Sequence, residues 1–242
     1  MQRYFVPSSQ FHEGFALVTG QDAHHIKNVM RNNINDEITV IDDFGHGFIG
    51  RITEINKISV KVELVSALDS DDKNSKITVA QAMIKRDRFE WFLEKSTELG
   101  VCEIIPTLFE YSVIKIDEEN ESKKILRYQT IVKEASEQSR RLMVPKIHNI
   151  HKLAQIKFEE YERILICYEG ASSENFITSL ASKLNSSMKI LVVIGPEGGI
   201  SPKELNLLLS KGGIICSLGK RILRSETAGL LVLSLLNSIW EC

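Results

Sequence analysis

Long apolar runs are absent from this sequence of 242 residues. No run reaches the roughly 18 residues that a membrane-spanning helix needs. The N-terminal segment, Met1–Pro7, also lacks the apolar core of a secretory signal peptide. The sequence therefore predicts a soluble, cytoplasmic protein with no membrane span.

Cysteine is scarce and scattered. The 4 cysteines lie far apart and form no Cys-x-x-Cys pair: Cys102, Cys167, Cys216 and Cys242. This spacing predicts free thiols and argues against a disulfide framework or a zinc site. His24 and His25 are adjacent, and neighbouring helical positions do not share a face, so a structural role is favoured over a metal site. We expect no bound metal.

An excess of positive charge is also missing. The 30 Lys and Arg residues are balanced by 32 Asp and Glu residues, which gives a net charge of -2. A protein that binds nucleic acid mainly through charge usually has a basic domain. An RNA substrate would therefore need a local basic face on a nearly neutral surface.

The sequence does contain a change of pattern near residue 68. Three short β-branched runs separated by turns, at 36–41, 47–55 and 58–65, predict a small barrel or meander, and a helix is expected at 21–31 before them. The polar residues that follow are typical of a linker. We expect a first domain over residues 1–68, a linker at 69–76 and a second domain over 77–242.

In the second domain, strands alternate with helices. We expect strands at 77–84, 101–108, 163–167 and 190–194, and helices at 88–98, 121–143, 176–184 and 227–240. Such alternation predicts an α/β fold, with a mostly parallel sheet covered by helices on both faces. Ligands bind such sheets at the carboxyl ends of the strands.

The most informative stretch begins with the apolar run Ile190–Ile194 and continues into Gly195-Pro196-Glu197-Gly198-Gly199. Ser201 and Glu204 then predict the capping box of a helix that begins at Pro202. The loop lacks the Lys-Ser/Thr end of a P-loop and the Gly-x-Gly-x-x-Gly spacing of a dinucleotide site. Glu197 would repel a phosphate but suits ribose hydroxyls or a cation. A sulfonium cofactor with a ribose and no phosphate meets both conditions.

Two further motifs follow predicted strands, so three strand ends are expected to line one pocket. They are Tyr168-Glu169-Gly170 and the segment Leu218–Ala228, which reads Leu-Gly-Lys-Arg-Ile-Leu-Arg-Ser-Glu-Thr-Ala. A lone glycine loop is often an ordinary tight turn. Combined with the second motif, a ligand site is the favoured interpretation.

These motifs resemble those of the RsmE family of ribosomal RNA methyltransferases, in the SPOUT superfamily. Further matches cover nearly the whole chain: His25–Arg31, Lys85–Glu90, Thr97–Val101 and Glu134–Ser139. Lys220 stands where the family more often has proline, and Arg140 where it often has glycine. The resemblance implies a PUA-like β-barrel at 1–68, and a SPOUT domain with a C-terminal trefoil knot that holds S-adenosylmethionine.

The resemblance also implies a reaction, namely methyl transfer from S-adenosylmethionine to N3 of a uridine in small-subunit (16S) ribosomal RNA. Two alternatives are a non-catalytic RNA-binding assembly factor of the same fold and a nicotinamide enzyme. The missing glycine fingerprint disfavours the latter. The residues expected to bind the cofactor are Glu169, Ile194, Gly195, Pro196, Glu197, Gly198, Gly199, Leu218, Gly219, Ile222, Leu223 and Ala228.

Catalysis is expected to depend on arginine. Uracil N3 becomes a good nucleophile when its proton leaves and the charge spreads onto O2 and O4, which arginines can stabilise. We assign this role to Arg224, helped by Arg221 or by an arginine of a second subunit. Glu226 is the candidate general base, with water as the alternative. The structural alternative for this cluster is an ion pair plus a helix cap from Ser225 or Thr227.

Three basic groups are candidates for RNA contact. Lys85, Arg86 and Arg88 lie at the start of the helix predicted at 88–98, where positive charges oppose the helix dipole. This placement suggests contact with RNA, and the alternative is a solvated helix end neutralised by Asp87 and Glu90. The candidates are Lys85, Arg86 and Arg88 at that helix start, Arg140 and Arg141 at a later helix end, and Arg3, Lys27 and Arg31 in the first domain.

The last predicted helix, 227–240, is apolar nearly all round. Such a helix is buried on more than one side, under the sheet or against a second copy of itself. The family resemblance favours the second copy, so we expect a homodimer.

Overall fold

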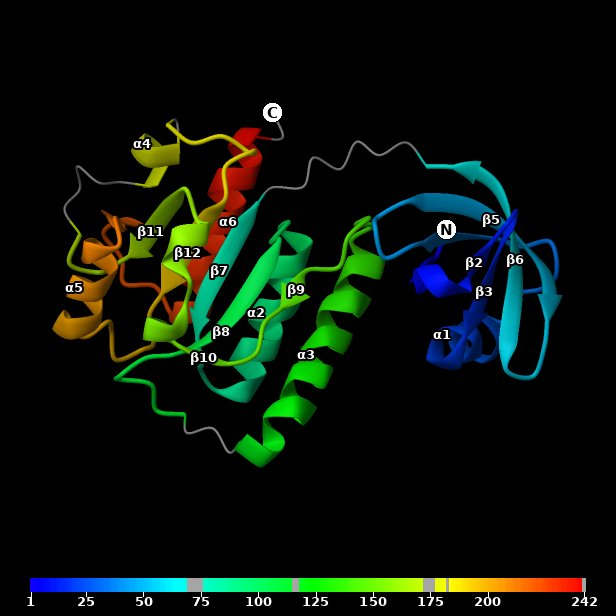
Figure 1. Ribbon diagram of the computed structural model, residues 1–242, viewed down its shortest axis with the longest axis horizontal. Helices are drawn as coiled ribbons and strands as arrows, with labels where there is room; N and C mark the ends of the chain where they lie inside the picture. The colour runs from blue at the N-terminus through cyan, green and yellow to red at the C-terminus, as the bar shows by residue number, and fades with distance from the viewer. Residues whose placement is uncertain (69–75, 115–117, 172–176, 182, 241–242) are drawn as a thin grey trace. The chain divides into compact units, whose positions relative to one another are not determined.

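The computed structural model describes residues 1–68, 76–114, 118–171, 177–181 and 183–240 (Figure 1). The chain divides into two units. The first comprises Met1–Asp72 and Ser136–Val144, and the second Lys73–Ala135 and Pro145–Cys242. The grouping of Ser136–Val144 with the first unit was not predicted from the sequence. Most of the predicted linker, 69–75, lies outside the described residues.

The first unit is a six-stranded curled sheet in the order β1-β4-β5-β6-β3-β2. Its pairs are antiparallel except for β1 with β4. Buried positions alternate along β6, where Val60 and Val62 point into a core shared with Tyr4 and Ile26. The strands are Arg3–Phe5 (β1), Phe11–His12 (β2), Phe15–Thr19 (β3), Glu37–Ile41 (β4), Gly47–Ile55 (β5) and Ser59–Ala67 (β6).

The helix predicted at 21–31 is shorter in the structure and changes type. Helix α1 covers Gly20–His24 and continues as one turn of π-helix, His25–Val29. It ends there because Arg31 has a φ of 55°, a left-handed conformation that a right-handed helix excludes. A short 3-10 turn, Ser8–Gln10, precedes β2.

The second unit is built on a parallel sheet in the order β10-β8-β7-β12-β11-β13, with β9 beside β8. All five residues of β12 and all six of β7 are buried, which explains the unbroken apolar run of β12. The strands are Ile77–Ala82 (β7), Glu103–Leu108 (β8), Lys146–Ile147 (β9), His151–Lys152 (β10), Arg163–Cys167 (β11), Ile190–Ile194 (β12) and Ile214–Cys216 (β13).

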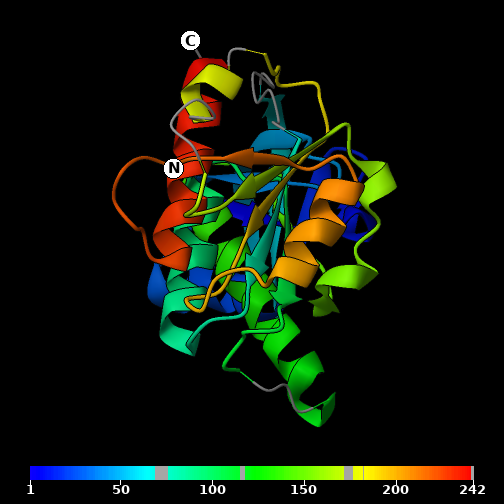
Figure 2. The same ribbon diagram turned by 90° about the vertical axis from the view of Figure 1, so that its left-hand side faces the viewer.

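Helices cover both faces of this sheet, as predicted (Figure 2). On one face, α6 (Ser225–Trp240) lies over β7 and β12 and packs beside α2 (Arg86–Glu98). On the other, Leu208 of α5 (Pro202–Ser210) packs in one core with residues of β7 and β12. That core also includes Leu153 and Phe158 from the 3-10 turns Leu153–Gln155 and Phe158–Glu160. Helix α4 (Ile177–Ala181) and α3 (Glu118–Gln138) as far as Ala135 complete the unit.

The start of α5 agrees with its sequence signal, whereas the end of α3 does not. The capping box of α5 is confirmed, because Ser201 Oγ accepts from the Glu204 N–H and the Glu204 carboxylate accepts from the Ser201 N–H. Helix α3 was predicted to reach Met143 but ends at Gln138, since Arg140 adopts a φ of 63°. In the described part of the chain, no helix is long and apolar enough to cross a membrane.

Candidate functional site

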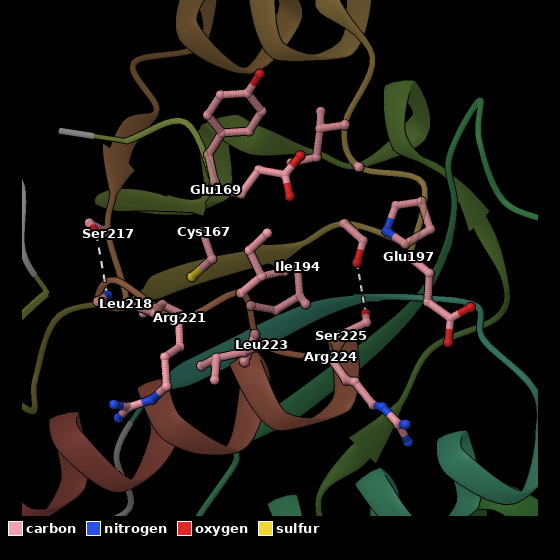
Figure 3. Close-up of a pocket in the computed structure, with 18 of the residues that line it drawn as sticks. Cys167, Glu169, Ile194, Glu197, Ser217, Leu218, Arg221, Leu223, Arg224 and Ser225 are labelled. Carbon is pink, nitrogen blue, oxygen red and sulfur yellow. Dashed lines mark hydrogen bonds between the residues drawn. The ribbon is translucent and has the colours of Figure 1, made fainter.

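A cavity of about 460 Å³ lies at the carboxyl ends of β11, β12 and β13 (Figure 3). Its walls come from the three loops that follow these strands: residues 167–169, the glycine loop 194–200 and residues 217–225. Because the strands are parallel neighbours, their ends meet at one edge of the sheet. The fold thus brings together motifs that are up to about 60 residues apart.

All the predicted cofactor residues except Gly198 line this cavity. Gly198 faces Tyr111 instead, because a Cβ added at Gly198 would lie 3.0 Å from the Tyr111 Cβ. Gly199 shapes the turn, with a φ of 79° and an N–H that donates to the Pro196 carbonyl at 2.9 Å. A Cβ at Gly195 would lie 2.6 Å from Ile200 Cγ1, so only glycine fits there without a shift.

The cavity combines apolar walls with charged groups. Ile194, Leu218, Leu223 and Ala228 supply apolar surface, and the exposed Glu169 and Glu197 supply carboxylates. Apolar walls suit a flat aromatic group, and carboxylates suit hydroxyls or a positive centre.

Arg221 and Arg224, the predicted catalytic arginines, both line the cavity and are exposed to solvent. Their guanidinium groups point away from each other in Figure 3. The chain therefore offers two separate cations at the mouth of the cavity.

Glu226, the predicted general base, is not among the residues that line the cavity. Its side chain is buried, and its Oε1 lies 3.8 Å from Arg88 Nε. Its Oε2 is buried with no hydrogen-bond partner among the described residues. The structure thus places this carboxylate beside Arg88 and does not direct it at the cavity.

Arg88 lies in a different setting from the one predicted. It lines the cavity, its Nη1 contacts Glu197 Oε1, and it also pairs with Glu226. Its place at a helix start had predicted contact with RNA. Arg88 reaches the cavity because β7 and β12 are parallel neighbours, so the segment after β7 lies beside the loop after β12.

Arg86 matches the structural alternative weighed for this helix start. It pairs with Glu90 at 2.8 Å, and Arg127 of α3 donates to the same carboxylate. The hydrogen bonds from Arg127 and, to a lesser degree, from Arg86 lower the pKa of Glu90 to about 2. Burial of the carboxylate acts in the opposite direction but is outweighed. Arg127, which joins α3 to α2, was not singled out from the sequence. Lys85 precedes α2 and is exposed.

The other predicted RNA residues lie in the first unit. Arg3 is engaged with the backbone of the segment after α3, because its Nη1 contacts the Arg140 carbonyl and lies 3.5 Å from that of Arg141. Lys27 belongs to the π-helix, and Lys27 and Arg31 are both exposed.

The cavity is also lined by two residues that were not assigned to the site from the sequence, Cys167 and Ser217. Cys167 Sγ lies 3.7 Å from Cys216 Sγ, and this hydrogen bond together with burial raises the pKa of the Cys167 thiol. Across the described residues, no group of three or more His, Cys, Asp and Glu side chains is arranged to hold a metal ion.

Comparisons with known proteins agree with this geometry. A model of an RNA methyltransferase domain matches residues 71–237, and one of an RNA methyltransferase PUA domain matches residues 18–65. Ribosomal RNA small subunit methyltransferase E of Bacillus subtilis is 34% identical over 97% of this chain and 95% of its own length. The protein of the same name from Rickettsia conorii is 32% identical over 88% of this chain and 85% of its own.

A solved structure is similar over nearly the whole chain. It is the crystal structure of a ribosomal RNA small subunit methyltransferase E from Neisseria gonorrhoeae bound to S-adenosyl methionine. The TM-score is 0.83 at 29% sequence identity, and the match covers 99% of this chain and 98% of that one.

Proposed function

We infer that this chain, which belongs to the ribosomal RNA small subunit methyltransferase E family, transfers a methyl group from S-adenosylmethionine to ribosomal RNA. The observation that carries this inference is the cavity itself. Three loops that the family motifs mark in the sequence form one cavity at the carboxyl edge of a parallel sheet.

The residues of the cavity fit this cofactor. The walls from Ile194, Leu218 and Leu223 suit an adenine ring, and the exposed Glu169 and Glu197 suit ribose hydroxyls and a positive sulfonium. The positive φ of Gly199 leaves the loop backbone open to close approach. When bound, the cofactor supplies a methyl group that its sulfonium has already activated.

The acceptor we propose is N3 of a uridine in small-subunit RNA. This nitrogen belongs to a weakly acidic imide, and it becomes nucleophilic when its proton leaves. N3 also lies on the Watson–Crick edge, so the base must be unpaired or flipped out before it can enter the site.

Arg224, supported by Arg221, would stabilise the negative charge that spreads onto O2 and O4 of the base. Both arginines are exposed at the cavity, so their guanidinium groups are accessible to an incoming base. Water is the better candidate for the proton acceptor, because the Glu226 carboxylate is buried beside Arg88 and does not line the cavity. The chain's contribution would then be orientation and charge stabilisation.

The loops 168–170, 195–199 and 218–223 would form the trefoil knot that the family resemblance implies. Their proximity around one cavity supports this proposal. A ribosomal RNA substrate would place the protein in the cytoplasm.

One experiment separates the proposed function from its alternatives. Purified protein is incubated with S-adenosylmethionine labelled in its methyl group and with small subunits that lack the modification. A methyltransferase labels the RNA. A non-catalytic assembly factor binds the subunits without labelling them, and a nicotinamide enzyme binds NADH in place of S-adenosylmethionine.

We propose that the first unit holds RNA through Lys27 and Arg31. Changing both residues, Lys27→Gln with Arg31→Asn, removes two exposed charges and leaves Arg3 in its backbone contacts. Asparagine is chosen because it tolerates the left-handed conformation of residue 31. The slope of log affinity for RNA against log salt should become shallower by about 2, one for each phosphate contact. An unchanged slope, measured with unchanged S-adenosylmethionine affinity, would exclude this surface.

We also propose that the working unit is a homodimer formed through α6. The face of α6 that does not cover the sheet exposes part of Leu231 and Leu235, and Ile239 is 44% exposed. Leu235→Arg should dissociate the dimer, because an unpaired charge in an apolar interface costs several kcal/mol, on the order of 2–5. Methyl transfer should fall with it, since α6 begins at the cavity.

The matched control is Leu209→Arg, the same change on the exposed side of α5, where Leu209 is 43% exposed. This variant should sediment like the wild type. A wild-type protein that sediments as a monomer at micromolar concentration and still methylates RNA at the full rate would overturn the dimer proposal.

A further inference from the structure

A chain of three hydrogen-bonded groups joins segments that are far apart in the sequence. Gln81, near the end of β7, donates from Nε2 to Ser225 Oγ at 2.7 Å. Ser225, the first residue of α6, donates its hydroxyl proton to the Gly195 carbonyl at 2.7 Å (Figure 3). Gln81 and Ser225 are both buried, and both Ser225 and Gly195 line the cavity.

The direction of this chain is fixed by chemistry. The Gly195 carbonyl can only accept, so the Ser225 hydroxyl must donate to it. The Ser225 oxygen is then left to accept, and Gln81 must present its NH₂ group. This orientation leaves Gln81 Oε1 buried with no hydrogen-bond partner among the described residues, which carries a cost. The amide is therefore held in the orientation that serves Ser225.

A second bridge runs parallel to the first. Glu226, the next residue of α6, pairs with Arg88, which in turn contacts Glu197. Ser225 contacts the glycine loop directly and is held by Gln81, whereas Glu226 reaches the loop through Arg88. Contacts from two consecutive residues of α6, Ser225 and Glu226, would restrain the glycine loop more than one contact alone.

Close packing supports the same arrangement. Gly229, one turn along α6 from Ser225, lies so near β7 and α2 that an added Cβ would sit 2.7 Å from Phe92 Cε2 and 3.0 Å from Gln81 Oε1. The helix start is thus held at a short distance from Gln81.

We propose that Ser225 and Gln81 are positioning residues for methyl transfer, which fix the glycine loop through the Gly195 carbonyl in the conformation that binds S-adenosylmethionine. The proposal rests on the function inferred above. It assigns to the β7–α2 region a role in cofactor binding, separate from RNA contact.

The test compares four variants by calorimetric affinity for S-adenosylmethionine and by melting temperature. Ser225→Ala removes both hydrogen bonds, and Gln81→Met keeps a long side chain but removes the donor and the unpaired acceptor. The double variant tests whether the two act through one chain. Ser96→Ala is the control, because Ser96 is fully buried and donates to the Leu93 carbonyl at 3.2 Å away from the cavity.

Ser225→Ala should weaken cofactor affinity about tenfold and Gln81→Met about threefold, values in the range of one lost hydrogen bond. The double variant should lose less than the product of the two, because the groups are coupled. Gln81→Met should melt close to the wild type, since it also removes an unsatisfied acceptor. In turnover, KM for the cofactor should rise more than kcat falls. Ser96→Ala should keep wild-type affinity.

Two results would overturn the proposal. One is wild-type affinity for S-adenosylmethionine in Ser225→Ala. The other is a Ser96→Ala variant that loses as much affinity and as much melting temperature as Ser225→Ala. A wild-type protein that does not bind S-adenosylmethionine would instead overturn the proposed function, so the two failures are distinguishable.

Discussion

Replacing Arg224 with alanine should lower kcat for methyl transfer by about 10²–10³, the usual effect of removing one group that stabilises a developing anion. The charge on O2 and O4 of the uracil exists only as the N3 proton leaves, so the arginine contributes more to the transition state than to the ground state. Affinity for S-adenosylmethionine should change little, because Arg224 is exposed at the mouth of the cavity.

The measurement is a single-turnover rate with saturating RNA and cofactor. Arg163→Ala is the matched control. Arg163 begins β11, at the edge of the sheet opposite the cavity, and its Nη1 donates only to the Glu162 carbonyl among the contacts described. The control should keep the wild-type rate. A rate for Arg224→Ala within threefold of the wild type would remove Arg224 from the mechanism.

Replacing Gly199 with valine should weaken S-adenosylmethionine binding about 100-fold, because strain of this kind is worth up to about 3 kcal/mol. An added Cβ would meet no protein atom closer than Glu169 Oε1 at 3.7 Å, so the protein itself is not crowded. The φ of 79° is the difficulty, since a β-branched residue avoids this region and the turn to Pro196 would rearrange.

Gly212→Val provides the control for this variant. Gly212 has a φ of 83°, an added Cβ there meets nothing within 4 Å, and the residue lies in the turn after α5, away from the cavity. Both variants should lose similar stability, but only Gly199→Val should lose cofactor affinity by calorimetry. Equal affinities for Gly199→Val and the wild type would mean that this loop does not bind the cofactor.

The parts of the fold that could be predicted are those with local causes. The β12 strand and the start of α5 follow from an apolar run, a glycine loop and a capping box within 15 residues, and the structure confirms each of them. The convergence of the three loops could also be predicted once the strands were placed, because ligand-binding loops follow the carboxyl ends of parallel strands.

The parts that could not be predicted depend on contacts between distant residues. Nothing in the sequence near Arg88 indicates Glu197 or Glu226, which meet it only because β7 and β12 are neighbours and α6 lies over both. The Gln81 and Ser225 pair is 144 residues apart for the same reason. Strands β1 and β2, of three and two residues, are too short to show a pattern.

Helix ends were the other source of error. Arg31 and Arg140 both stop a helical segment by adopting a left-handed conformation, yet neither is the glycine or asparagine that usually marks such a stop. In the first case the predicted helix was too long by two residues, and in the second by five.

The central claim is that this chain methylates N3 of a uridine in small-subunit ribosomal RNA. The most direct measurement incubates wild-type protein and the Arg224→Ala variant with labelled S-adenosylmethionine and unmodified small subunits, then locates the label in the digested RNA by mass spectrometry. We predict that the wild type gives labelled N3-methyluridine in the small-subunit RNA and that the variant gives almost none in the same time. Label on another atom or another nucleotide, or RNA that stays unlabelled by a protein that binds the cofactor, would contradict the claim.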